Sequence, residues 1–217
     1  MGSTTRQRIL DESRQLFNRR GYGDTTLAQI AAAVGIAEGN LWYHFRTKGA
    51  LVAALEEELR DAVRERRLAY QSGSPASDDY VEAALFGAGQ KWAYRFLLRD
   101  YLQFPKVRRP LQSDPDLAAD FEVMRDALER MKKEGLFRRD LPLDLDVLSR
   151  SLWIVSRYWT DYLQEQEGLE DISWSEQQRG FEQQFAVLLP YLTSAARRSI
   201  ESAFLRISGE LVQRRIV

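Results

Sequence analysis

Apolar residues recur along this 217-residue chain at intervals of three and four, which is the period of amphipathic helices. No run alternates between apolar and polar residues as a half-buried strand would, and Gly and Pro separate the periodic runs. We therefore expect an all-α protein. The predicted helices cover residues 5–20, 26–34, 38–44, 47–70, 79–104, 115–134, 144–164, 174–189 and 193–214.

Signals at helix ends mark the first three of these helices. Gly21 and Gly23 follow the first run, where glycine commonly ends a helix. Thr25 has a hydroxyl that can accept a hydrogen bond from a free N–H of the next helix and so cap it. Gly35 then separates the second helix from a short third one. The N-terminal region is therefore expected to be three helices joined by tight turns.

The segment 71–78, Gln-Ser-Gly-Ser-Pro-Ala-Ser-Asp, is the clearest linker in the chain. It predicts an N-terminal domain of residues 1–50, extended by a connecting helix over about 47–70, and a larger helical domain over 77–217. In the larger domain, helix 144–164 is apolar on two faces, which indicates a central position. The last two helices carry apolar stripes that either pack within one subunit or form a four-helix interface between two copies.

The composition excludes several classes of site. The absence of cysteine excludes disulfides, thiolate zinc sites and cysteine nucleophiles, and His44 is the single histidine. With no phosphate-binding loop and no Ser–His arrangement, we expect no catalytic residues, no metal site, no cofactor and no enzyme activity. No apolar run approaches the ~20 residues that span a membrane, and the polar start lacks a signal core. We therefore expect a cytoplasmic protein without a membrane partner.

The net charge of −1 conceals an uneven distribution. Residues 1–50 contain seven Lys or Arg and four acidic residues, a net of +3, which leaves −4 for the remaining 167 residues. A mildly basic N-terminal region on an acidic body is compatible with DNA binding once a motif supports it.

Residues 25–45 contain such a motif. Two short helices joined by a glycine turn have the geometry of a helix-turn-helix. The second helix must be short, with small or polar residues on its outer face, because it enters a groove about 12 Å wide. Leu41 and Phe45 are spaced to point back toward Ile30 and Leu16. The outer face of the second helix is supplied by Glu38, Gly39, Asn40, Tyr43 and His44.

The motif resembles the DNA-binding domain of TetR-family repressors, and the resemblance covers about residues 5–55. The matching positions are Thr26-x3-Ile30-Ala31-x3-Gly35-Ile36-x2-Gly39-x-Leu41-x-Tyr43-His44-Phe45-x2-Lys48-x2-Leu51. Downstream, only the number and length of the helices are similar. The resemblance implies a homodimer whose recognition helices enter successive major grooves of a double-stranded DNA operator, with half-sites about 34–36 Å apart or a multiple of that.

The resemblance also implies a set of DNA-binding residues between Thr26 and Lys48. Phosphate contacts fix the register of a protein on DNA, and base contacts give specificity. Base edges would be approached by Glu38, Gly39, Asn40 and Tyr43. Phosphates would be held by Thr26, His44 and Lys48. The alternatives are a structural hydrogen bond for His44 and a solvated charge for Lys48.

Ala37 departs from the family pattern, and Trp42 stands at a position where the residue type varies more within the family. Ala37, which belongs to the same DNA-binding segment, stands where the family usually has Ser or Thr to cap the recognition helix, and the loss should cost on the order of 1 kcal/mol. Trp42 is expected to pack beside the next helix instead of contacting DNA.

Aromatic and basic residues of the second domain indicate an effector pocket, although each aromatic alone is more typical of core packing. A buried Arg157 needs a carboxylate. One candidate partner is Asp100, in an internal pair with Arg157. The alternative is an anionic ligand held by Arg95 or Arg157. The candidate ligand-binding residues are Trp92, Arg95, Phe96, Phe121, Met124, Trp153, Arg157 and Tyr158.

These observations predict a repressor that binds a palindromic operator as a dimer formed through the last two helices. A small apolar or amphipathic effector would release it by binding preferentially to a conformation whose DNA-binding heads are wrongly spaced. The alternative is an adaptor of the same fold whose C-terminal domain binds a protein partner.

Overall fold

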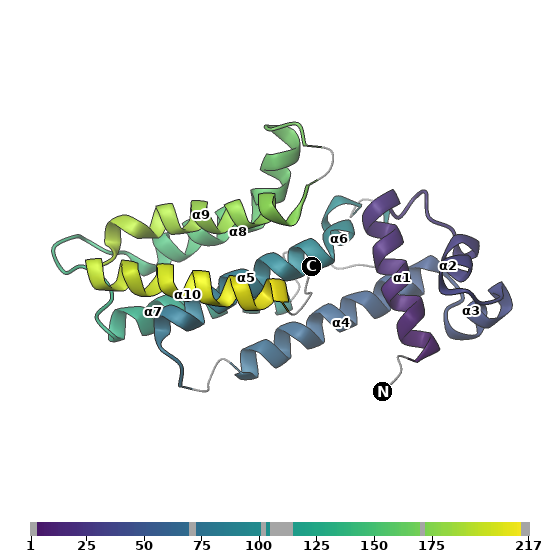
Figure 1. Ribbon diagram of the computed structural model, residues 1–217, viewed down its shortest axis with the longest axis horizontal. Coiled ribbons are helices and arrows are strands. Elements are labelled where there is room, and N and C mark those ends of the chain that lie inside the picture. Colours follow the sequence, from purple (N-terminus) through teal and green to yellow (C-terminus); the bar gives the residue numbers. More distant parts are fainter. Residues whose placement is uncertain (1–3, 70–72, 101–102, 105–114, 170–171, 214–217) are drawn as a thin grey trace. The chain divides into compact units, whose positions relative to one another are not determined.

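The computed structural model describes residues 4–69, 73–100, 103–104, 115–169 and 172–213. These residues form helices and no strand; a single bridge joins Phe137 and Leu192. The all-α prediction is therefore confirmed. The helices are α1 Thr5–Arg20, α2 Leu27–Val34, α3 Glu38–His44, α4 Lys48–Ala69, α5 Ala76–Ala93, α6 Arg95–Arg99, α7 Pro115–Lys133, α8 Leu145–Glu165, α9 Trp174–Leu188 and α10 Ser194–Gln213, with a 3₁₀ turn at Leu189–Tyr191 (Figure 1).

The chain divides into two compact units. The first contains Met1–Arg66 together with Ala93–Pro110, and the second contains Arg67–Trp92 together with Leu111–Val217. This division differs from the single boundary expected at segment 71–78, because the residues after α5 belong to the first unit. Residues 71 and 72 of that segment lie outside the described residues, and α5 already begins at Ala76.

The single helix expected over residues 79–104 is in fact two helices, and this prediction is wrong for a specific reason. The chain departs from helical geometry at Tyr94, with φ −117° and ψ 28°. Asn18 of α1 donates from Nδ2 to the carbonyl of Ala93 (2.8 Å) and accepts at Oδ1 from the N–H of Phe96 (3.1 Å). These bonds replace partners that a continuous helix would have provided. The interrupting side chain comes from a residue 75 positions earlier in the chain.

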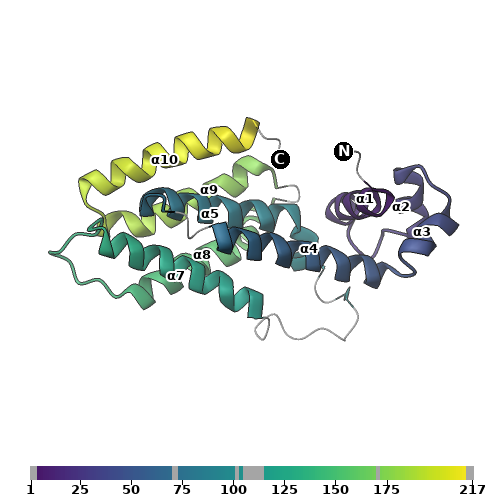
Figure 2. The same ribbon diagram turned by 90° about the horizontal axis from the view of Figure 1, so that it is seen from below.

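The core of the first unit joins the N-terminal helices to α6. Helix α1 packs against α2 and α6, and α2 packs against α3, as Figure 2 shows for α1 to α3. The buried apolar residues are Ile9, Leu10, Leu16, Phe17, Ile30, Ala31, Val34, Leu41, Phe45, Leu51, Val52, Leu55, Phe96, Leu97 and Phe104.

The cap of α2 is one residue later than expected. Thr26 accepts at its hydroxyl from the N–H of Gln29 (3.2 Å), and the side chain of Gln29 accepts from the N–H of Thr26 (2.9 Å), which completes a capping box. Thr25 is buried instead and donates to the carbonyl of Gly21 (2.8 Å). Helix α2 ends at Gly35, whose φ of 75° favours glycine.

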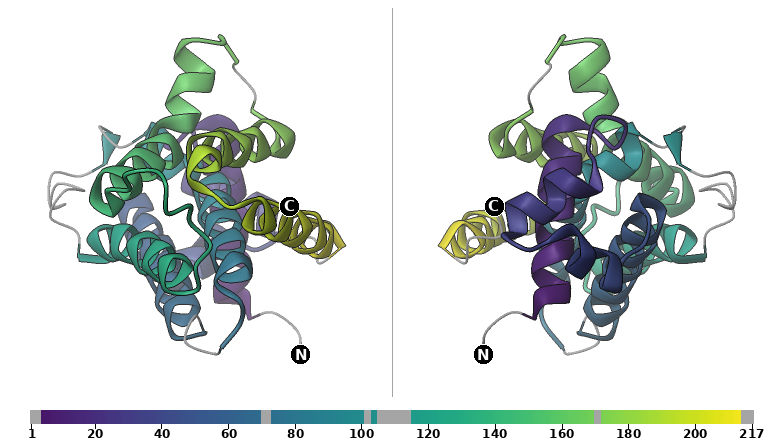
Figure 3. Two further views of the ribbon diagram at one scale, coloured as in Figure 1. Left: turned by 90° about the vertical axis from the view of Figure 1, so that its left-hand side faces the viewer. Right: turned by 90° about the vertical axis from the view of Figure 1, so that its right-hand side faces the viewer.

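The second unit is built around α8, which packs against α7 and α9 (Figure 3). Leu148, Leu152 and Leu163 on one side of α8 are buried. These contacts agree with the central position expected for α8, but its second apolar face is not covered in the isolated chain. The second face leaves four large side chains about half exposed, namely Val147, Ile154, Tyr158 and Tyr162.

The apolar stripe of α10 is buried within the same unit. Its members are Ala196, Ile200, Ala203 and Ile207. Polar contacts to α5 reinforce this packing: the hydroxyls of Ser77 and Ser199 are 2.9 Å apart, and Arg206 donates to Asp78 (2.6 Å). The stripe is therefore already used inside one chain.

Candidate nucleic-acid interface

Helix α3 exposes a short polar face, and its opposite side packs against α2. Ile30 of α2, Leu41 of α3 and Phe45 just after α3 are buried, so the inward side of α3 is fixed by apolar contacts, as expected. Between the helices, Gly35 accommodates a left-handed backbone. With only seven residues, α3 exposes nearly every side chain that does not belong to this core.

The residues expected to contact DNA lie mostly on this exposed surface. Tyr43 is 85% exposed. His44 is half-buried and meets the ring of Tyr43 edge-on, with centroids 5.2 Å apart. The exposed members of the set are Thr26, Ala37, Glu38, Gly39, Asn40 and Tyr43.

The start of α3 has no side-chain cap. Ala37 is the N-cap residue, with φ −67° and ψ 145°, and its methyl group offers no acceptor to the first turn. Its carbonyl accepts from the N–H groups of Asn40 (3.0 Å) and Leu41 (3.2 Å). Glu38 is the single acidic residue of the first turn, where a negative charge is favourable.

Trp42 lies where the sequence reasoning did not place it. Its side chain is 57% exposed, so the expectation that it packs beside the next helix is wrong. The spacing contains the signal that was missed: Gly39 and Trp42 are three residues apart on one helix and therefore share a face. Trp42 and Tyr43 together give α3 an aromatic outer edge.

Lys48, the first residue of α4, has its ammonium group held by the chain. Nζ donates to the carbonyls of Tyr22 (2.6 Å) and Gly23 (3.2 Å) and lies 4.4 Å from the centroid of the Tyr22 ring. Burial lowers the pKa of Lys48, and the nearby carboxylate of Asp24 opposes that shift. Lys48 is therefore not a free solvated charge. Its ammonium group has three N–H donors, and these two carbonyls use two of them.

A polar cluster at the end of α6 binds the end of α1. Arg99 donates to the carbonyls of Phe17 (2.7 Å) and Asn18 (3.0 Å), and it pairs with Asp100 through Nε (2.9 Å) and Nη2 (3.0 Å). Asp100 is buried and also accepts from the N–H of Tyr22 (2.7 Å). The sequence marked Asp100 as a partner of Arg157, which is wrong, because Arg99 and Tyr22 occupy its carboxylate.

The eight candidate ligand residues are divided between the two units. Phe96 is buried in the first unit, with its ring 5.2 Å from that of Phe17 and 6.3 Å from that of Phe104, so its assignment to an effector pocket is wrong. The break at Tyr94 is the cause, because it directs α6 and with it Arg95 into the first unit.

The other candidates belong to the second unit. Phe121 of α7 and Trp153 of α8 make an edge-to-face contact with centroids 6.4 Å apart. The guanidinium of Arg157 lies 5.2 Å from the ring centroid of Tyr158 on α8. Met124 and Trp92 are half-buried on α7 and α5. Phe121, Met124 and Trp153 thus mark the α7–α8 contact as the most coherent part of the predicted set.

The described residues contain no group of three or more His, Cys, Asp or Glu residues that could hold a metal ion. None of the described helices is both long enough and apolar enough to cross a membrane.

Comparison with family models matches most of the chain. Residues 9–55 match the model of bacterial regulatory proteins of the tetR family, and residues 58–200 match a model described as bacterial transcriptional repressor.

Individual relatives agree with these matches. The HTH-type transcriptional repressor Rv1474c of Mycobacterium tuberculosis is 28% identical over 158 residues, covering 64% of this chain and 73% of its own. The regulator AcrR of Shigella flexneri is 37% identical over 71 residues, and this match spans only 33% of either protein. A crystal structure of a TetR-family regulator from Marinobacter aquaeolei VT8 has 26% identity and a TM-score of 0.71, covering 94% of this chain and 98% of its own.

Proposed function

The chain belongs to the TetR family of bacterial regulatory proteins, and we propose that it is a repressor that binds a palindromic DNA operator as a dimer. The observation that carries this proposal is the outer face of α3, which is polar and aromatic, exposed, and fixed from behind by Ile30, Leu41 and Phe45. A repressor that acts by occluding a promoter needs only this face and a second copy at the correct spacing. Such a protein works where the DNA is, in the cytoplasm.

The exposed residues divide into two roles. Glu38, Gly39, Asn40 and Tyr43 approach base edges, and their exposure in the free protein supports this role. Thr26 supports a phosphate contact because its hydroxyl accepts from the N–H of Gln29 and keeps its own hydrogen to donate.

His44 and Lys48 are the remaining phosphate ligands of the proposal. His44 ends α3, and Lys48 begins α4 only four residues later. Because phosphate contacts release counterions, their number is measurable from the salt dependence of affinity.

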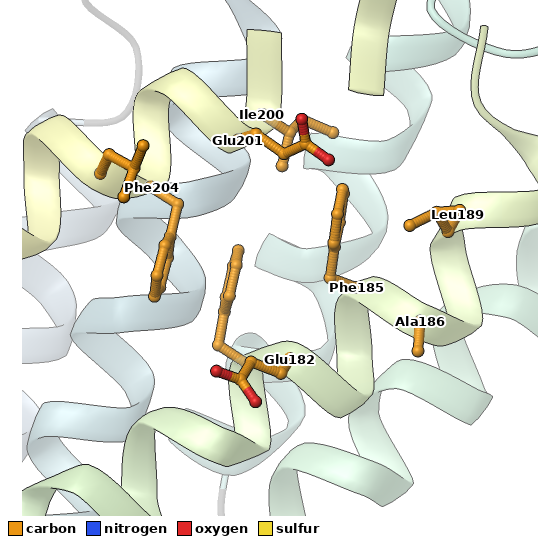
Figure 4. Close-up of a pocket in the computed structure, with 9 residues that line it drawn as sticks. Glu182, Phe185, Ala186, Leu189, Ile200, Glu201 and Phe204 are labelled. Atoms are coloured by element: carbon orange, nitrogen blue, oxygen red, sulfur yellow. The ribbon is translucent and has the colours of Figure 1, made fainter. Parts of the chain in front are cut away.

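We propose that the dimer forms through the last two helices. A groove of about 530 Å³ lies between α9 and α10 beside the buried stripe of α10, with which it shares Ile200. It is lined by Phe181, Phe185, Ala186, Leu189, Ile200, Phe204 and Leu205 with Glu182 and Glu201. Figure 4 shows Phe185 of α9 and Phe204 of α10 at this groove, with the two glutamates on opposite sides of it. Leu205 is 73% exposed.

Charge complementarity favours a second copy as the occupant of the groove. Arg197 and Arg198 are exposed on α10, one turn from Glu201. In a two-fold interface each chain presents the same surface to the other, so arginines from one copy can meet glutamates of the other while the apolar residues are covered.

A small apolar or amphipathic effector is the proposed inducer. The α7–α8 contact at Phe121, Met124 and Trp153 supports an apolar binding site, and Arg157 supports a site for an anionic group at its edge. The effector acts only through its preference for the conformation that does not bind DNA.

The test is selection of DNA by the purified protein from a pool of random duplexes at low salt. The expected result is enrichment of a short near-palindrome that Tyr43→Ala and Lys48→Ala no longer bind. Arg60→Ala is the matched control, because Arg60 pairs with Glu57 about 18 Å along α4 from Lys48. A pool without any enriched sequence at low salt contradicts the proposal.

A further inference from the structure

Tyr22 is held from two directions by residues that lie far apart in the sequence. Its backbone N–H donates to Asp100, the residue that follows α6, and its carbonyl accepts from Lys48, the residue that begins α4. Its ring also lies under the Lys48 ammonium group. One residue of the α1–α2 turn therefore connects the end of α6 to the start of α4.

The Asp100 side of this connection is rigid. Asp100 is buried, and its carboxylate is bound by Arg99, which also donates to the carbonyls of Phe17 and Asn18 in the last turn of α1. A Cβ added at Gly21 would lie 3.7 Å from Arg99 Nη2 and 3.8 Å from Asp100 Oδ2, so both side chains lie within van der Waals range of the α1–α2 turn. Movement of Asp100 therefore has to move the N–H of Tyr22 or break its hydrogen bond.

The Tyr22 ring is fixed on its other side by aromatic packing. Its centroid lies 5.6 Å from that of Phe17 and 5.1 Å from that of Phe104, the latter edge-on. The ring and the carbonyl of Tyr22 thus stand at defined positions, and the Lys48 ammonium group takes its position from both.

Two of the three N–H donors of Lys48 point at the carbonyls of Tyr22 and Gly23. This arrangement orients the third donor and removes most of the freedom of a long side chain before DNA binds. A lysine held in this way differs from a flexible surface lysine, because the residues that hold it decide where its charge is presented.

We propose that Tyr22 and Asp100 are positioning residues for the phosphate anchor Lys48, so that the end of α6 controls a DNA-backbone contact through Tyr22. The inference rests on the proposed role of Lys48 as a phosphate ligand.

The experiment measures affinity for the duplex enriched from the random pool, by fluorescence anisotropy, over a series of salt concentrations. The variants are Lys48→Ala, Asp100→Asn, Tyr22→Leu and the two double variants with Lys48→Ala. Each phosphate contact contributes about 0.9 to the slope of log affinity against log salt. Lys48→Ala in both subunits should therefore reduce the slope by about 1.8.

Asp100→Asn and Tyr22→Leu should each lower affinity about fivefold or more with Lys48 present, and less than about twofold in the Lys48→Ala background. Each should also reduce the salt slope toward that of Lys48→Ala. A purely structural role would instead give equal losses in both backgrounds and an unchanged slope, which overturns the inference. Thermal unfolding checks that the variants are folded. If Asp100→Asn is not folded, Tyr22→Leu decides the positioning role, because it removes the ring beside the Lys48 ammonium group and keeps both backbone groups of residue 22.

The two failures are distinguishable. If Lys48→Ala changes neither affinity nor slope, then the phosphate role of Lys48 is wrong, and the inference falls with it. If Lys48→Ala has its expected effect but the other two variants act independently of it, then only the positioning role is wrong. Arg60→Ala should leave the slope unchanged, which shows that loss of one positive charge on α4 is not sufficient.

Discussion

Gly180 of α9 lies directly over the indole ring of Trp159 on α8. A Cβ built on Gly180 would be 2.7 Å from Cδ1 and 2.9 Å from Cγ of Trp159. The indole N–H donates to the carbonyl of Glu176 (2.8 Å), and the guanidinium of Arg179 lies 5.7 Å from the ring centroid. The ring is thus fixed from several sides, and α9 approaches α8 closely only because residue 180 has no side chain.

Gly180→Ala should therefore destabilise the protein, although alanine is the better helix former. Overpacking of a fixed aromatic ring costs about 1–3 kcal/mol, and differential scanning calorimetry should show a lower Tm. Gly87→Ala on α5 is the matched control: nothing lies within 4 Å of its added Cβ, so the substitution should raise stability by about 0.5–1 kcal/mol. Equal effects of the two substitutions would show that Trp159 can move aside.

Ala37→Ser should stabilise the first unit. A serine at the N-cap of α3 supplies the missing acceptor for the first turn, which is worth about 0.5–2 kcal/mol. Chemical denaturation followed by circular dichroism measures the change. Ala33→Ser, at an exposed interior position of α2, should instead be neutral or slightly destabilising. A gain of the same size at both positions would contradict the capping explanation.

Trp42→Ala should weaken binding to the enriched duplex while leaving Tm nearly unchanged. The side chain is mostly exposed and adds little to the core, yet it lies beside Tyr43 on the outer edge of α3. Leu41→Ala is the contrasting variant: removal of a fully buried leucine should cost about 2–5 kcal/mol of stability. If Trp42→Ala lowered Tm and left DNA affinity intact, Trp42 would be a structural residue after all.

Leu205→Asp should dissociate the dimer, because it places a charge on the exposed apolar edge of the α9–α10 groove. Sedimentation velocity of the purified protein measures the oligomeric state. Ile154→Asp on the exposed face of α8 is the comparison, since that face also presents large apolar side chains. Dissociation by Ile154→Asp alone would transfer the interface to α8 and refute the proposed one.

Local signals in the sequence were sufficient for much of the fold. The limits of α1 and α3 agree with those expected, because Gly21, Gly35 and the spacing of Leu41 and Phe45 are read within a few residues. The absence of a cap at Ala37 was likewise visible in the residue type alone. The outward positions of Glu38, Asn40 and Tyr43 follow from helical periodicity once their inward neighbours are known.

Features that depend on distant residues could not be read in this way. The break at Tyr94 is caused by Asn18, and the position of the Lys48 ammonium group is set by carbonyls 25 and 26 residues earlier. Asp100 looked like a partner for Arg157 because both are charged residues in apolar runs, whereas its neighbour Arg99 turns back toward it. Hydrogen bonds between residues this far apart in the chain leave no periodic pattern in the sequence from which they could be predicted.

The first unit is completed by a segment that follows all of α4 and α5 in the chain, and this segment contains Phe96, Arg99, Asp100 and Phe104. A nascent chain that has only reached the end of α4 still lacks Arg99, which binds two carbonyls in the last turn of α1, and two aromatic rings of the core. The DNA-binding unit therefore cannot complete its core during translation until residues 93–104 have been made. For the same reason, a chimera that grafts residues 1–66 onto a foreign body should be unstable unless residues 93–104 are carried across with them.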